Sequence, residues 1–242
     1  MKQYKTELHC HTRDASPCSN MSAEETVERY LEYGYTTLVV TNHFCAFATM
    51  DTKSEWLAHC EKTFRAYDNL VAASGGRLNI LLGMEARFVQ NSNDYLVYGG
   101  FDREFLESYG GELLKLGVDR FADLIHSRGG FISQAHPFRY HQTVTVPGRL
   151  DGIEVFNGHF KHDSHNDLAE AWAERYGKIK TSGTDHHDHD HYPDGGIMTD
   201  EPVTSIEQLI STLRSGKYEL IRDYPMGKPQ YDAFGQLLGF RK

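Results

Sequence analysis

Histidine and acidic side chains stand at or just past the ends of short apolar runs at five places in this chain. They are His9, His11, His43, Glu85, His136, Asp185 and His187. The run at residues 37–42 leads to His43, for example, and the run at residues 80–84 leads to Glu85. Imidazole and carboxylate groups together suit Zn, Mn or Fe better than Mg or Ca. The pattern therefore predicts a centre for divalent transition metals.

The first of these places has the spacing of a chelating pair. His9 and His11 lie two residues apart on a predicted strand, so both side chains point to one side of the sheet, with Cα atoms about 7 Å apart. That separation lets both imidazoles reach one ion. Asp185 and His187 repeat the spacing near the other end of the chain. Glu85 adds a carboxylate that can bridge two cations.

Strand-like and helix-like patterns alternate along the sequence. Strands are expected at residues 5–8, 36–41, 78–84, 95–98, 131–135, 152–156 and 178–181. Helices are expected at residues 22–34, 54–73, 118–128, 164–176 and 205–214, with one or two short ones in 103–116. Such alternation predicts an α/β fold with a parallel sheet. We expect the sheet to close into a barrel, because the candidate ligands come from strands at both ends of the chain and barrel strands end at one rim.

Length and composition set broad limits. A chain of 242 residues with 39% hydrophobic content fits a single α/β domain spanning residues 1–242. Its net charge of −9 disfavours nucleic acid as a partner, because a phosphate backbone binds basic surfaces. A small phosphorylated substrate is compatible with that charge, since bound cations can invert the local field.

The cysteines and the hydropathy of the chain indicate the cellular compartment in which the protein is expected. Cys10, Cys18, Cys45 and Cys60 form no CxxC pair and no dense framework, which favours a reducing cytoplasm. Residues 1–5 lack the apolar stretch of a signal peptide, and no run approaches the ~20 apolar residues of a membrane span. We expect a soluble cytoplasmic protein with no membrane partner. The sequence does not indicate an oligomeric state.

The order of the motifs resembles that of the PHP superfamily (polymerase and histidinol phosphatase). The motifs are H-x-H at 9–11, Thr-Asn-His at 41–43, Gly-Met-Glu at 83–85, Ala-His-Pro at 135–137 and Gly-Thr-Asp-His-His at 183–187. The likeness covers residues 7–187, and its specificity lies in the joint pattern. It implies a distorted seven-stranded, TIM-like β/α barrel with up to three divalent metals at the C-terminal strand ends. It also implies hydrolysis of phosphomonoesters, such as histidinol phosphate, or of nucleic-acid phosphodiesters.

The resemblance further implies which side chains share an ion. One ion would be held by His9, His11, Glu85 and Asp185. Glu85 would bridge to a second ion that His136 also binds. His43 and His187 would hold a third.

The chain departs from the family pattern at two places. Many relatives have an Asp or His five or six residues after the H-x-H, where this chain has Ser16 and Pro17. Asp14 and Cys18 lie nearby, but neither is in register. A further family histidine is replaced around residues 94–95. Two tightly bound metals are therefore as compatible with the sequence as three.

Metal chemistry then predicts the mechanism. A hydroxide held between the cations, with its pKa lowered toward ~7, would attack phosphorus in line. Arg139 and Arg87 lie on the expected rim and are candidates to bind the phosphoryl oxygens, and His159 is a further candidate for substrate contact. Specificity would reside in the loops at residues 44–53, 87–94, 139–149 and 186–200. The histidines of residues 185–191 other than His187 are expected in a solvated loop over the barrel mouth.

Two other readings remain open. An amidohydrolase also has an H-x-H on its first strand, but it commonly uses a bridging Lys at a later strand end. Here Glu85 stands where a bridging ligand is needed, and Lys178 and Lys180 precede the last ligands. The other reading is a metal-binding regulatory domain without catalysis, which an assay of phosphatase activity with added Mn or Zn would distinguish.

Overall fold

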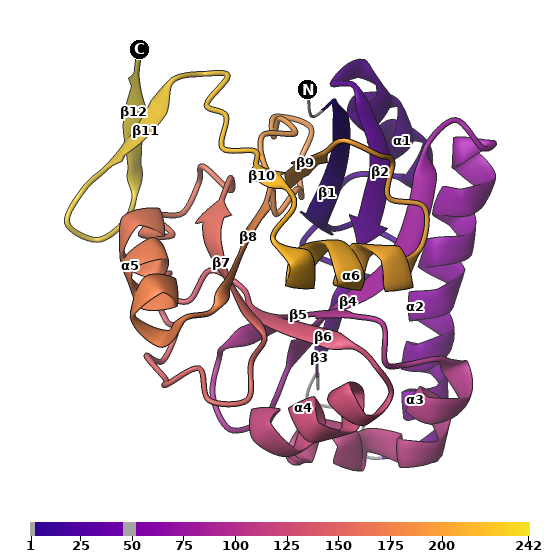
Figure 1. The fold of residues 1–242 in the computed structure, drawn as a ribbon. Coiled ribbons are helices and arrows are strands. Elements are labelled where there is room, and N and C mark those ends of the chain that lie inside the picture. The colour runs from indigo at the N-terminus through magenta and orange to yellow at the C-terminus, as the bar shows by residue number, and fades with distance from the viewer. Residues whose placement is uncertain (1–2, 46–51) are drawn as a thin grey trace.

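A computed structural model describes residues 3–45 and 52–242 as a mixed α/β fold with a nearly closed, barrel-like sheet (Figure 1). Its strands are β1 (Tyr4–Cys10), β2 (Tyr35–Val40), β3 (His43–Cys45), β4 (Asn79–Arg87), β5 (Asp94–Tyr98), β6 (Phe131–Gln134), β7 (Gly152–Asn157), β8 (Ile179–Gly183), β9 (Ile197–Thr199) and β10 (Glu219–Leu220). A separate hairpin contains β11 (Lys228–Tyr231) and β12 (Leu237–Arg241). The helices are α1 (Ala23–Glu32), α2 (Lys53–Ser74), α3 (Arg103–Tyr109), α4 (Val118–Ser127), α5 (Asn166–Tyr176) and α6 (Ile206–Ser215), with a 3₁₀ turn at Gly110–Lys115.

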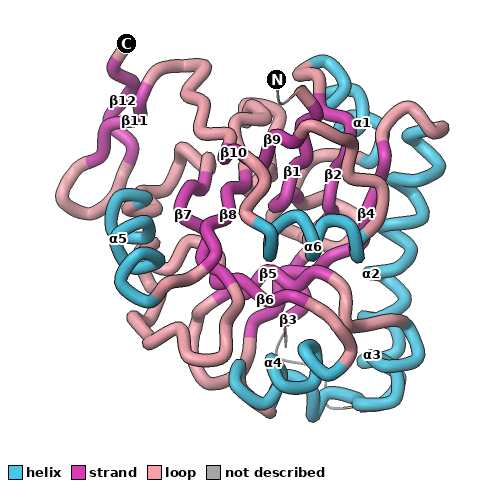
Figure 2. Tube along the Cα trace, in the orientation of Figure 1, coloured by secondary structure: helices cyan, strands magenta, loops and turns pink. Residues whose placement is uncertain are grey.

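Backbone hydrogen bonds between the strands curve the sheet into a nearly closed barrel. Neighbouring strands follow the order β10-β9-β1-β2-β4-β5-β6-β7-β8, and β3 pairs with β4 beside this path. Just past β8, the Asp185 N–H donates to the His9 carbonyl (2.8 Å), and the His11 N–H donates to the His186 carbonyl (3.0 Å). These bonds join the ends of β1 and β8, so segments from opposite ends of the chain meet at one rim (Figure 2).

The prediction of a parallel sheet is wrong for part of it. β1, β2 and β4 are parallel, as are β6, β7 and β8, but β5 runs antiparallel to both β4 and β6. The connection between β4 and β5 spans only residues 88–93, which is too short for the helical crossover that a parallel pair requires. β9 is also antiparallel, to β1 and to β10.

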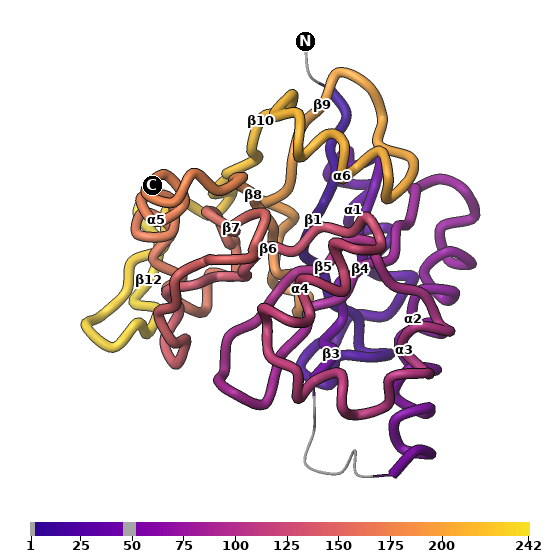
Figure 3. Tube along the Cα trace, turned by 60° about the horizontal axis from the view of Figure 1, so that its bottom comes forward, coloured from indigo at the N-terminus to yellow at the C-terminus, as the bar shows by residue number. Residues whose placement is uncertain are grey.

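Helices α1 and α2 cover the outer face of the sheet beside β2 and β4, as Figure 3 shows from a second direction. The predicted capping box of α1 is confirmed, because Ser22 and Glu25 each bond the other's backbone N–H. Val27 of α1 and Leu70 of α2 pack in one cluster with Leu38 of β2. Among the described helices, none combines the length and apolar character needed to cross a membrane.

The last helix covers an apolar part of the sheet's interior. Leu209 and Leu213 of α6 belong to a buried cluster with Leu8, Val39 and Tyr98. In Figure 1, α6 crosses the strands near the middle of the molecule. Ordinary apolar burial thus fills this region, and the polar side chains gather where the strands end.

The C-terminal hairpin was not predicted from the sequence. β11 and β12 pair in antiparallel fashion and project beside α5 (Figure 1). The Tyr231 hydroxyl donates to the Phe160 carbonyl (3.0 Å), and His162 forms an isolated bridge with Gln236. The hairpin is therefore attached to the loop that follows β7.

Candidate metal centre

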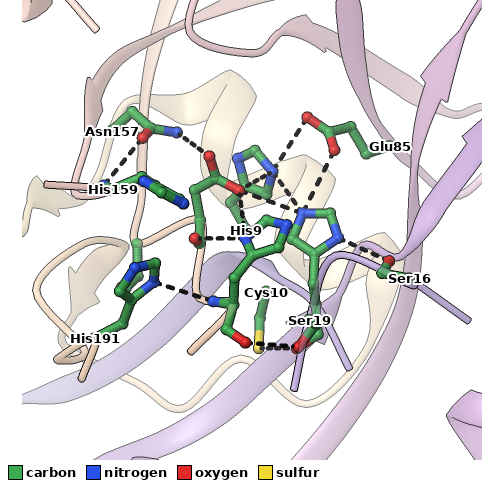
Figure 4. Close-up of polar contacts among 12 residues, drawn as sticks. His9, Cys10, Ser16, Ser19, Glu85, Asn157, His159 and His191 are labelled. Atoms are coloured by element: carbon green, nitrogen blue, oxygen red, sulfur yellow. Dashed lines mark hydrogen bonds and ion pairs between the residues drawn. The ribbon is translucent and has the colours of Figure 1, made fainter. Parts of the chain in front are cut away.

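The seven predicted ligands lie in one cluster at the rim of the sheet where the ends of β1 and β8 meet. His9 lies in β1, His11 directly after it, His43 at the start of β3, Glu85 in β4, His136 after β6, and Asp185 and His187 after β8. All are buried except His43, which is partly exposed. Figure 4 shows His9 at the centre of this cluster, with Glu85 on one side and Asn157 on the other. Glu85 lies inside β4 rather than beyond it, because pairing with β5 extends the strand to Arg87.

Four of these side chains converge on one point. His9 Nε2 lies 3.1 Å from His11 Nε2 and 3.3 Å from both Glu85 Oε1 and Asp185 Oδ1. His11 Nε2 lies 3.4 Å from Glu85 Oε2 and from Asp185 Oδ1. Atoms bound about 2.1 Å from a single ion would lie about 3.0–3.4 Å apart in octahedral or tetrahedral geometry. The spacing is that of a coordination shell.

The hydrogen bonds on the far side of each ring fix which nitrogens face inward. His9 Nδ1 lies 2.8 Å from Glu154 Oε1, where it must donate to the carboxylate. His11 Nδ1 lies 3.0 Å from Ser16 Oγ, whose proton goes to Asn42 Oδ1, so His11 Nδ1 is also the donor. If both rings were neutral, their Nε2 atoms would face each other at 3.1 Å with lone pairs only. Burial lowers the pKa of His9, but Asp185, Glu154 and Glu85 raise it well above its usual value, so a proton on His9 Nε2 or a cation between the rings makes this contact favourable.

Further donor atoms surround this group. His136 Nε2 lies 3.2 Å from Glu85 Oε1, and His43 Nδ1 lies 2.7 Å from Glu85 Oε2. His187 Nδ1 donates to the Asp185 carbonyl (2.9 Å), which leaves its Nε2 as the available ligand atom. Four overlapping sets among the described residues could each hold an ion: His9, His11 and Glu85; His9, His136 and Asp185; His11, His43 and His187; and His43, Glu85 and Asp94.

Without bound metal, the charges in the cluster perturb one another strongly. Burial tends to raise the pKa of Glu85, but His43 and His9 hold it well below its usual range. Burial also tends to raise the pKa of Asp185, but His9, Arg139 and His187 hold it well below its usual range. Burial lowers the pKa of His11, and His187 and His43 lower it further. The two carboxylates are therefore ionised and ready to bind cations.

Two residues in the cluster have strained backbones. His136 (φ 24°) and Asp185 (φ 54°) adopt left-handed conformations that side-chain-bearing residues rarely occupy. Such strain persists where the surrounding structure imposes it, and it concentrates at functional sites. Here it aims both side chains into the cluster.

The candidate substrate-binding residues line a hollow above the cluster. This hollow, of about 330 Å³, is bordered by Arg87, Arg139 and His159, together with several of the candidate ligands. Arg139 Nη2 donates to Asp185 Oδ2 (2.7 Å) and to Asn157 Oδ1 (2.6 Å). Arg87 is held by two bonds to Asp94 (2.6 and 2.7 Å). Of the predicted specificity loop at 44–53, residues 46–51 lie outside the described part of the chain.

Sequence reasoning missed the carboxylates that support the ligands. Glu154 in β7 bonds His9 Nδ1 and accepts from the His136 N–H (2.9 Å). Glu7 in β1 accepts from the N–H groups of His9 (2.8 Å) and Thr184 (3.0 Å), at an irregularity in the pairing of β1. For Glu154 the available signal was a single acidic residue between the apolar residues Ile153 and Val155, whereas β1 also contains Lys5 and Thr6 and gave no such signal for Glu7.

The predicted solvated loop is partly wrong. His186 and His191 are buried, and only His189 among the remaining histidines of this run is exposed. His191 Nδ1 accepts from the His187 N–H (3.1 Å), so it belongs to the support of the cluster. Alternating His and Asp looks solvated in sequence, but closure of β8 onto β1 draws the segment inward.

Cys18 lies at the same cluster, in the loop that follows β1. Its thiol is within hydrogen-bonding reach of both His43 and His187. Burial alone would raise the pKa of this thiol, but the two imidazoles lower it to about 6. Asp14, the other nearby candidate, instead accepts from the Asn69 side chain (2.9 Å).

No protein-family model matches this sequence, and no curated protein is similar to it in sequence. Solved structures do share its fold. A proposed metal-dependent phosphoesterase from Bifidobacterium adolescentis has a TM-score of 0.50 at 15% identity, covering 87% of this chain and 96% of that one. PsfC from Pseudomonas syringae has a TM-score of 0.61 at 16% identity, covering 87% and 89%. An amidohydrolase from Chromobacterium violaceum, with bound sulfate and no metal, has a TM-score of 0.50 at 16% identity, covering 90% and 99%.

Proposed function

We propose that this protein is a metal-dependent phosphoesterase that hydrolyses a phosphomonoester of a small molecule. The observation that carries the proposal is the convergence of His9, His11, Glu85 and Asp185, whose ligand atoms lie at the spacing of a coordination shell, with 3.1 Å between the Nε2 atoms of His9 and His11. These residues would hold one ion, Glu85 would share a second with His136, and His43 and His187 would take part in a third. Zn, Mn or Fe suits this ligand set. The solved structure described as a metal-dependent phosphoesterase supports the same reaction class at the level of fold.

Bound divalent metals would supply an activated water and neutralise charge on the phosphoryl oxygens. The chain's own residues would orient the ester. Arg139 keeps one edge of its guanidinium on Asp185 and lines the hollow, so it would bind a non-bridging oxygen. Arg87 and His159, on other parts of the same wall, would contact the substrate in the same way.

A second cavity favours an organic monoester over a polymer. About 600 Å³ in volume, it lies between the loop after β7 and the C-terminal hairpin, and it shares His162 with the hollow above the cluster. Phe160, Tyr224 and Tyr231 line it. This is a suitable compartment for a small leaving group, and the chain's net charge of −9 opposes a nucleic-acid strand.

The proposal includes the finer architecture implied by the PHP resemblance. The path β1-β2-β4-β5-β6-β7-β8 would be the seven-stranded, TIM-like barrel, with β9 and β10 added at β1. The site would then lie at the strand ends, as in other α/β barrels.

An amidohydrolase-type reaction is the second candidate, because one structure with this fold is an amidohydrolase. Lys180 pairs with Glu170 (3.0 Å) and Glu174 (2.8 Å), and Lys161, which lines the hollow, pairs with Asp188 (2.8 Å). Glu85 would replace the bridging Lys. These contacts favour the phosphoesterase.

The test combines metal analysis with hydrolysis assays on the same samples. Wild-type protein, a His9→Ala/His11→Ala variant and a His189→Ala control are purified without added metal. Metal content is measured, and each protein is assayed with phosphomonoesters, phosphodiesters and amides. We expect two or three equivalents of Zn, Mn or Fe and monoesterase activity in the wild type and the control. The double variant should lose both.

Other results would overturn parts of the proposal. Hydrolysis of amides but not of phosphoesters would assign the amidohydrolase reaction. Bound metal without hydrolysis of any substrate would indicate a non-catalytic metal-binding domain. A wild-type protein that binds no transition metal would refute the metal centre itself.

A further inference from the structure

The loop that carries Cys18 is anchored on both sides to candidate ligands. Before it, Ser16 Oγ accepts from the His43 backbone N–H (3.0 Å). After it, Ser19 Oγ donates to the His187 carbonyl (2.8 Å), and the Asn20 N–H donates to the same carbonyl (3.0 Å). The backbone around Cys18 is therefore held against the segments that bear both histidines.

The side chain of Cys18 faces the same cluster. Its thiol is within hydrogen-bonding reach of the His43 and His187 imidazoles and lines the hollow above them. Cys10, Cys45 and Cys60 are buried, whereas Cys18 is exposed at the rim, where an ion could reach it.

A separate observation also points to a ligand here. Glu85 Oε2 is buried and accepts no hydrogen bond in the described structure, although His43 Nδ1 lies only 2.7 Å away and His11 Nε2 only 3.4 Å away. The 3.4 Å contact from His11 Nε2 has the spacing of two ligands of one cation, whereas the 2.7 Å contact from His43 Nδ1 is that of an ion pair. The Nδ1 contacts of His43 and His187, to Glu85 and to the Asp185 carbonyl, leave the Nε2 atom of each ring for a further partner.

We propose that Cys18 is a thiolate ligand of a metal ion that His43 and His187 also bind. One sulfur and two imidazole nitrogens, with a fourth position left to water or substrate, form a typical site for tetrahedral Zn. Thiolate is a soft ligand, so this position selects Zn over Mn, whereas the His9–His11–Glu85–Asp185 position accepts either. The proposal rests on the metal-binding part of the proposed function and not on phosphoester chemistry.

Cobalt substitution tests this assignment directly. Metal-free protein is titrated with Co(II), and the near-ultraviolet sulfur-to-cobalt charge-transfer band is followed with the visible ligand-field bands. The variants are Cys18→Ser and Cys18→Ala, with Cys60→Ala as the control, because Cys60 is a residue of α2 that is buried in the apolar core. Circular dichroism establishes that each variant is folded.

We expect the sulfur-to-cobalt band in the wild type and in Cys60→Ala. Both Cys18 variants should lose this band and should bind one equivalent of cobalt fewer than the wild type. Ligand-field bands from the remaining site should persist. Cobalt binding without a sulfur band in the wild type would overturn the role of Cys18 and leave the imidazole–carboxylate site standing. No cobalt binding at all would overturn both. A sulfur band in a protein that hydrolyses no phosphoester would support Cys18 and contradict the proposed function.

Discussion

Replacing Glu154 by Gln should weaken metal binding although Glu154 is not a ligand. Its Oε1 accepts from His9 Nδ1 (2.8 Å), and its Oε2 accepts from the His136 N–H (2.9 Å) and from Asn157 Nδ2 (2.9 Å). Gln has only one acceptor oxygen, so neither orientation of its amide satisfies both sides. If the amide nitrogen faces His9, that ring must accept at Nδ1 and carry its proton on Nε2, the atom needed for metal. If the nitrogen faces His136, three donors meet in a buried space.

The expected losses of metal affinity and of stability depend on the hydrogen bonds that Gln cannot make. Removing such an outer partner of a metal-binding His typically costs 10–100-fold in affinity, or about 1.4–2.7 kcal/mol. The unpaired donors should also lower the unfolding free energy of the metal-free protein by about 1–3 kcal/mol. Competition with a chromogenic chelator gives the Zn(II) affinity, and urea denaturation gives the stability.

Glu170→Gln is the matched control for this change. Glu170 bonds Lys180 and Arg222 and lies outside the metal-binding groups of the described residues, so its variant should bind Zn(II) with wild-type affinity. A folded Glu154→Gln protein that also binds Zn(II) as tightly as the wild type would refute the argument that Glu154 sets the His9 tautomer.

Three further predictions concern the substrate, pH and packing. Arg139→Ala should reduce kcat/KM for a phosphomonoester at least tenfold (~1.4 kcal/mol) with metal content unchanged, and Arg139→Lys should retain part of the lost activity. An unchanged kcat/KM in Arg139→Ala would exclude a substrate role for Arg139. Burial lowers the pKa of His191 to about 4, against about 6.5 in the unfolded chain, so its contribution to stability is complete above pH ~6.5 and is lost as the pH falls toward ~4. In metal-free protein, His191→Asn should remove up to about 3 kcal/mol of that acid-induced loss, and an identical pH profile in urea denaturation would contradict the assignment. Gly195→Ala would place a Cβ 2.1 Å from the Gly183 carbonyl carbon, so it should destabilise by about 1–3 kcal/mol or more, whereas Gly148→Ala, where a Cβ meets nothing within 4 Å, should have little effect on the urea midpoint.

Periodicity predicted most helices and the strands that lead to the ligands. The Ser22–Glu25 capping box starts α1 as expected, and a second box at Thr52 and Glu55 starts α2. The direction of β5 was not predictable from periodicity, because alternation of side chains is the same in parallel and antiparallel strands. β9 and β10 are too short, at three and two residues, to give a readable pattern.

The support around the ligands was harder to predict because it depends on contacts between distant segments. Glu154 and His9 are separated by 145 positions and bond only because β7, β8 and β1 lie around one rim. Cys18 was noted only as out of register with a family position. The bonds of Ser16 and Ser19 bring it against His43 and His187, whatever its place in an aligned motif.

The sequence by itself determined the chemistry of the candidate centre, because the choice of imidazole and carboxylate ligands is a property of residue type. It also determined the local elements, since caps and apolar periodicity act over a few neighbouring residues. Only the tertiary structure decided which nitrogen of each ring faces inward, which carboxylate supports which histidine, and that Cys18 joins the cluster. Those outcomes depend on the closure of β8 onto β1, which brings together groups far apart in the chain and excludes water from the space between them.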